Sequence, residues 1–82
     1  MKELIGKKIH VCFNGMWYEE ITEIVRYTEK YLLVKVRADD GFERYECFEK
    51  RNGNWDFDMY WYRSDKTTAL YLFDLDLKKS AA

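Results

Sequence analysis

The stretch L-L-V-K-V-R-A-D-D-G-F-E-R-Y-E-C-F, residues 32–48, decides the fold of this chain. Branched and aromatic side chains stand on both sides of an Asp-Gly pair, which is among the strongest short signals for a β-hairpin because tight turns need positive φ. A two-residue loop at this pair places Val36 opposite Tyr45 and Val34 opposite Cys47. Apolar residues then meet on one face, so the sequence predicts a hairpin in this register.

Turn signals recur along the rest of the chain at a spacing typical of short strands. They are Asn14-Gly15, residues 28–30, Asn52-Gly53-Asn54 and residues 64–66. Between the turns lie six segments rich in Val, Ile, Thr and aromatic residues, and the chain has no proline. This pattern favours a mostly β fold, a small antiparallel barrel or strongly bent meander of five to six strands.

Two further hairpins extend the predicted face if residues 52–54 form a three-residue loop and the chain turns again at Asp65. The predicted pairs are Cys47–Met59, Tyr45–Trp61, Phe57–Phe73, Met59–Tyr71 and Trp61–Ala69. All of these pairs bring apolar side chains to the same side, so three consecutive hairpins agree on one buried face.

Residues 16–27 fit two secondary structures. Trp17, Ile21 and Val25 lie on one face of a strand, whereas Tyr18, Ile21 and Val25 also fit a helical stripe. We favour a bent or bulged strand, because bulges redirect side chains in small barrels. The alternative is one short helix near residues 18–27.

Length and composition predict a single domain over residues 1–79, with residues 80–82 as a tail. Five Phe, seven Tyr and three Trp supply a core without disulfides or metal, since each large aromatic can bury roughly 150–250 Å². Two cysteines are too few for a disulfide scaffold, and no signal peptide or long apolar run is visible. We therefore expect a cytoplasmic protein that does not bind a membrane and needs no cofactor.

Residues 11–49 carry a motif known from other small barrels. Asn14-Gly15 followed by Trp17-Tyr18, then a second strand with Gly41 and Glu43, resembles the SH3-like barrels of the Tudor type. The resemblance implies an SH3-like barrel over this half of the chain.

The predicted register gathers acidic and aromatic residues on the outer face of the last two strands. Asp56 faces Asp74 there, and opposed like charges need an offsetting cation, a basic partner or neighbouring Lys and Arg. Large apolar groups beside carboxylates are typical of protein-binding surfaces. The predicted partner-binding residues are Asp56, Asp58, Tyr60, Tyr62, Leu70, Leu72, Asp74 and Asp76.

Our first functional hypothesis is therefore a non-catalytic module that presents this acidic face to a basic surface of another protein. A compact, aromatic-rich, slightly acidic chain also resembles inhibitors carried by phages and mobile elements. Phosphate-binding loops and nucleophile motifs are absent from the sequence, so we do not expect an enzyme. His10 and Cys12 are a weak candidate pair for metal or thiolate chemistry.

Two alternatives remain open at this point. Basic and aromatic residues on the first three strands could bind nucleic acid, as in other small barrels. The predicted residues for this alternative are Trp17, Tyr18, Arg26, Tyr31, Lys35 and Arg37. The second alternative is a small-ligand binder or a homodimeric subunit that associates through residues 69–73, where both strand faces are apolar.

Overall fold

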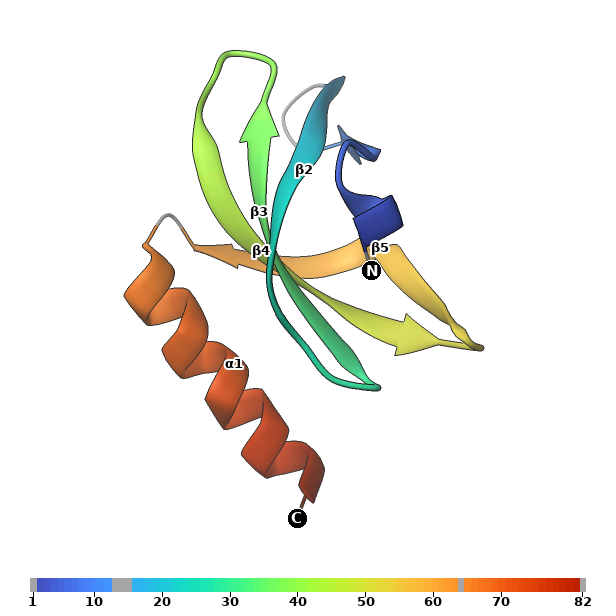
Figure 1. Cartoon of the computed structure of the whole chain (residues 1–82), viewed down its shortest axis with the longest axis vertical. Helices are drawn as coiled ribbons and strands as arrows, with labels where there is room; N and C mark the ends of the chain where they lie inside the picture. The colour runs from blue at the N-terminus through green and yellow to red at the C-terminus, as the bar shows by residue number, and fades with distance from the viewer. Residues whose placement is uncertain (1, 13–15, 64, 82) are drawn as a thin grey trace.

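Figure 1 shows a computed structural model of the chain. The structure describes residues 2–12, 16–63 and 65–81, apart from the side chains at 10–12, 16–17, 58–63, 76 and 79–81. The elements in chain order are a 3-10 turn η1 (Lys2–Leu4), the strands β1 (Lys8–Cys12), β2 (Met16–Tyr27), β3 (Tyr31–Ala38), β4 (Glu43–Arg51) and β5 (Asn54–Arg63), and the helix α1 (Lys66–Ala81).

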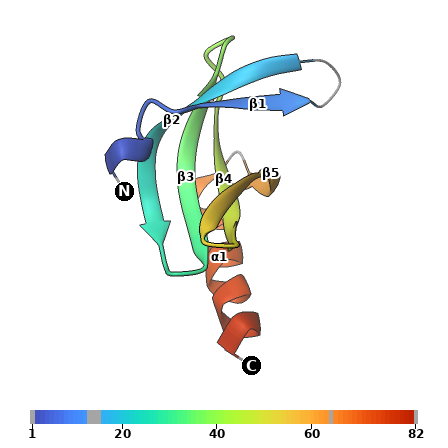
Figure 2. The same cartoon turned by 90° about the vertical axis from the view of Figure 1, so that its right-hand side faces the viewer.

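The five strands form one antiparallel sheet in the order β1-β2-β3-β4-β5. The sheet curls into a nearly closed barrel that is compatible with an SH3-like fold (Figures 1 and 2). The described connections, between β2 and β3, β3 and β4, and β4 and β5, are short, as expected for a meander. The predicted turn at Asn14-Gly15 lies outside the described residues. The prediction of a mostly β fold with a small antiparallel barrel is therefore confirmed.

Residues 16–27 form a single bulged strand, and the alternative helix near residues 18–27 is wrong. The pairing of β2 with β3 shifts twice, between Ile21 and Glu23 and between Ile24 and Arg26. Each shift lets the strand bend, and after the first one Ile24 lies inside opposite Val34, so Val25 belongs to the outer cluster while Ile21 stays inside. The prediction that Ile21 and Val25 share a face fails for this reason.

The β3–β4 hairpin differs from the predicted one by a single residue. Its loop has three residues, closed by a hydrogen bond from the Ala38 N–H to the Phe42 carbonyl at 2.8 Å. Gly41 takes a φ of 88°, as expected for the third residue of such a loop. Val34 consequently lies opposite Glu46, and the predicted Val34–Cys47 pair is wrong.

Compared with the prediction, the observed β3–β4 pairing exchanges the inward and outward faces of β4. Leu33 lies opposite Cys47, and Lys35 lies opposite Tyr45, so the predicted Val36–Tyr45 pair is also wrong. A shift of one residue moves every side chain of a strand to the other face. Alternate residues from Arg44 to Phe48 face the barrel interior, whereas Tyr45 and Cys47 face outward.

The β4–β5 hairpin turns through two residues, not three. Asn52 and Gly53 both have positive φ, 52° and 83°, which is the geometry of a tight two-residue turn. Beyond the turn, residues 57–59 lie between the pairs Glu49–Asp56 and Phe48–Tyr60, so β5 contains a bulge. The predicted pairs with Met59 and Trp61 are wrong, because Cys47 lies opposite Trp61 and Tyr45 lies opposite Arg63.

The segment predicted as a sixth strand is the helix α1. Asp65 caps its first turn, where its carboxylate accepts hydrogen bonds from the N–H and the hydroxyl of Thr68 at 2.8 and 2.9 Å. The helix includes residues 80 and 81, which the sequence assigns to the tail. Three predicted cross-strand pairs are therefore wrong: Phe57–Phe73, Met59–Tyr71 and Trp61–Ala69.

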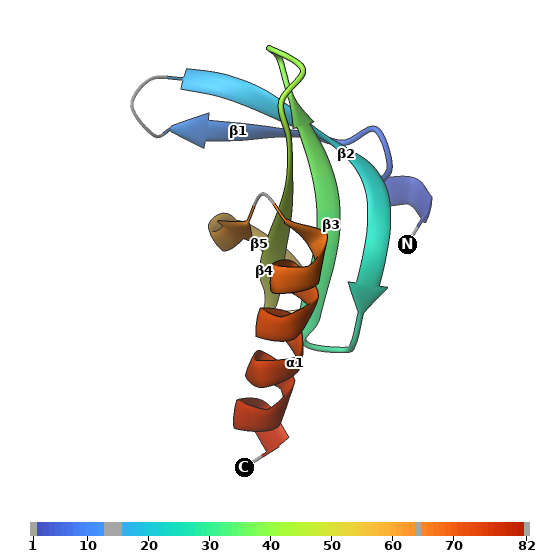
Figure 3. The same ribbon diagram turned by 90° about the vertical axis from the view of Figure 1, so that its left-hand side faces the viewer.

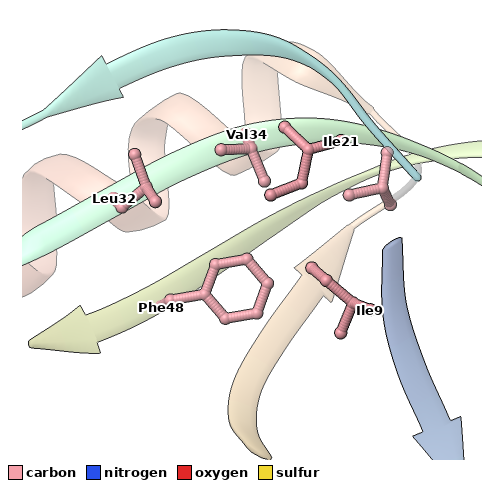
Figure 4. Packing of buried hydrophobic residues seen from close by; sticks show 6 residues of the cluster. Ile9, Ile21, Leu32, Val34 and Phe48 are labelled. Carbon is pink, nitrogen blue, oxygen red and sulfur yellow. The ribbon is translucent and has the colours of Figure 1, made fainter. Parts of the chain in front are cut away.

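Two apolar clusters lie on opposite sides of β3 and β4. The barrel interior holds Ile9, Ile21, Leu32, Val34, Val36 and Phe48 (Figure 4). Phe57 packs edge-to-face on Phe48. On the outside, α1 lies across β3 and β4 and covers Leu33 and Cys47 with Ala69 and Phe73 (Figure 3). Residues 32–34 are apolar throughout because β3 is covered on both faces.

Substitutions at two neighbouring helix positions separate the helix from the predicted strand. Phe73 is fully buried and Tyr71 is 63% exposed, whereas a strand would bury both on one face. We expect Phe73→Leu to lower the free energy of unfolding by about 1–2 kcal/mol, because it leaves a cavity. The matched change Tyr71→Leu should stay within about 0.5 kcal/mol. Urea unfolding measures both, and equal losses would contradict the helical packing.

Candidate functional site at the β3–β4 end of the barrel

Two glutamates lie inside the barrel, close to the β3–β4 turn. Glu46 of β4 is fully buried opposite Val34, and Glu19 of β2 is 1% exposed opposite Ile9 and Ala38. Both point inward because they occupy the same strand faces as the apolar residues of the interior cluster. Buried carboxyl groups are rare in small domains, since removing a charge from water is unfavourable. This pair is therefore the first candidate for a functional feature.

Arg44 links the carboxyl pair to the molecular surface. Its Nε lies 3.4 Å from Oε2 of Glu19, and its side chain is 16% exposed. The guanidinium also lies over the ring of Phe42, 5.7 Å from the ring centroid. These contacts form a connected series from the exposed Phe42 through Arg44 to Glu19 and then Glu46.

The pKa of Glu46 is raised from its ordinary value of 4.5 to about 9. Burial is the main cause, followed by the hydrogen bond to Glu19 and repulsion from its negative charge, while Arg44 acts in the opposite direction. At neutral pH, Glu46 is therefore protonated and carries no charge. Arg44, whose Nε lies beside Glu19, is the positively charged group next to the pair.

Two hollows flank the chain where β3 enters the turn. One of about 340 Å³ is lined by Ala38, Asp39, Asp40 and Arg44. The other, of about 190 Å³, shares Ala38 and Asp39 and reaches Glu19 and Tyr18. Charged side chains thus contribute to the lining of both hollows, and Glu19 of the buried pair lines the second.

The β3–β4 turn itself is acidic and carries an aromatic group. Asp39 accepts a hydrogen bond from the Tyr18 N–H at 3.4 Å, and Asp40 accepts one from the Phe42 N–H at 2.9 Å. Within the described residues, neither aspartate forms an ion pair with a Lys or Arg side chain. Glu43 follows them and lies 3.4 Å from the Lys35 ammonium, and the Phe42 ring is 54% exposed. We call residues 39–43 the acidic turn.

The acidic face predicted on the last two strands is not assembled as one sheet surface. Asp56 lies opposite Glu49, and Arg51 contacts both carboxylates, at 3.5 and 3.8 Å. Asp74 lies on α1 and pairs with Arg26 at 3.1 Å. The predicted opposition of Asp56 and Asp74 is therefore wrong, and each carboxylate has a basic neighbour from the chain itself.

The other residues of the predicted face fall into two groups. Leu70 and Leu72 are half-buried on α1. The side chains of Asp58, Tyr60, Tyr62 and Asp76 lie outside the described residues. Residues 69–73 are helical, and Ala69 and Phe73 are buried against the sheet, so this segment cannot pair as a strand with a second copy.

The predicted nucleic-acid residues do not form a continuous basic surface. In the sheet register, Arg37 lies between Glu20 and Glu43, and Lys35 lies between Glu23 and Tyr45. Arg26 pairs with Asp74, and Tyr31 packs edge-to-face against Phe73 at 6.4 Å. Tyr18 is half exposed beside Asp39, and the side chain of Trp17 lies outside the described residues. Acidic groups thus alternate with the basic ones.

Sequence reasoning did not single out Arg44 and Glu46. Arg44, Glu46 and Phe48 share one face of β4, and Tyr45 and Cys47 share the other. Both sets alternate with the period of a strand, so only the length of the β3–β4 loop decides which face points inward. A three-residue loop with Gly41 in its third position would have predicted the observed register. The sequence contains this glycine, but a two-residue loop places more apolar side chains in the predicted interior than a three-residue loop does.

Comparison with models of known families, with curated proteins and with solved structures finds no match for this chain. Over the described residues, α1 is too short and polar to span a bilayer. Nor do three or more His, Cys, Asp or Glu side chains of the described ranges gather as a metal site.

Ionisation of Glu46 should make the protein less stable as pH rises. The unfolded carboxyl ionises near pH 4.5, whereas the folded one keeps its proton up to about pH 9, so stability is full below pH 4.5 and falls through this range. We expect Glu46→Gln to remove this dependence and to raise the free energy of unfolding by up to about 3 kcal/mol at pH 7. Denaturant unfolding between pH 4 and 9 measures it.

Glu43→Gln is the matched control, because the Glu43 side chain is about half exposed. It should leave the pH dependence of unfolding close to that of the unchanged chain. If Glu46→Gln were as pH-dependent as Glu43→Gln, Glu46 would not hold the proton.

Proposed function

We propose that this chain is a non-catalytic module that binds a partner protein with a basic surface through the acidic turn, residues 39–43. The observation that carries the proposal is the pairing of an exposed aromatic ring with carboxylates that have no described Lys or Arg partner. Phe42 offers apolar area, and Asp39 and Asp40 offer charge. Protein interfaces combine aromatic anchors with charges that orient the partner and speed association.

The position of the turn also supports a binding role. The β3–β4 hairpin projects beyond the rest of the sheet, away from α1 (Figures 1 and 3). Side chains at such a tip reach a partner without rearrangement of the barrel, and loops on rigid scaffolds commonly carry binding residues. The loop is held in shape by the hydrogen bonds of Asp39 and Asp40, so little ordering is needed on binding.

A protein partner suits the charges better than a nucleic acid. Asp39 and Asp40 would repel phosphates, and the basic residues of the sheet alternate with acidic ones. The resemblance of residues 11–49 to Tudor-type barrels also supports a binding module. An inhibitor that covers a basic groove of its target is one form of this function.

Charge reversal at the acidic turn tests the proposal. The unchanged chain, immobilised and exposed to a lysate of its source cells at low salt, should retain a specific partner. We expect Asp39→Lys combined with Asp40→Lys to lower that retention at least tenfold, because attraction becomes repulsion. Quantitative mass spectrometry of the retained proteins measures the effect.

The matched control reverses two charges at the other end of the barrel, Glu3→Lys with Glu29→Lys. Both residues are exposed, so this variant has the same net charge as the first but an unchanged acidic turn. It should retain the partner at the original level. Equal losses in the two variants, or retention of nucleic acid in place of protein, would refute the proposal.

A further inference from the structure

We draw no further inference here: the strongest candidate, the hollow of about 420 Å³ between the β2–β3 and β4–β5 turns that Tyr27 and Trp55 line together with Glu29 and Lys50, carries none because its lining combines aromatic rings with charges of both signs and nothing among the described residues points to one class of ligand.

Discussion

The conformation of Gly41 sets the register on which the barrel interior depends. With a φ of 88°, this residue closes a three-residue loop between β3 and β4 and fixes Val34 opposite Glu46. A side chain at this position would strain the backbone, because positive φ is unfavourable for L residues. A loop one residue shorter would turn Glu46 to the outside of the barrel and Cys47 to the inside. One glycine thus determines whether the barrel contains a carboxyl pair.

The carboxyl pair is a local conflict with the rest of the fold. A domain of 82 residues has a thin stability margin, and burial of Glu19 and Glu46 reduces it at neutral pH. The proton on Glu46 and the contact of Glu19 with Arg44 offset part of the cost. Positions where a sequence departs from an apolar interior are expected at functional sites. The departure here lies beside the acidic turn, which gives it a functional interpretation.

The sequence predicted the described turns between β2 and β5 and most of the strands, but not the pairing between them. Asn-Gly and Asp-Gly pairs identify turns because few residues tolerate positive φ, yet they do not fix loop length to one residue. The prediction of a strand in the last segment was wrong for another reason. Ala69, Tyr71 and Phe73 fit a strand, and Ala69, Phe73 and Leu77 fit a helix, so periodicity could not decide between them. The cap formed by Asp65 and Thr68 favours the helix.

The residues that stabilise the fold are not the residues of the acidic turn. Phe48 and the interior cluster hold the barrel together, and Phe73 fixes α1 on the outer face of β3 and β4. Residues 39–43 belong to neither cluster. Polar substitutions at the acidic turn therefore leave both clusters intact, and their effects on binding can be read without a change of fold. Glu46 is the exception, because it lies between the interior cluster and the turn, so a change in its charge acts on stability.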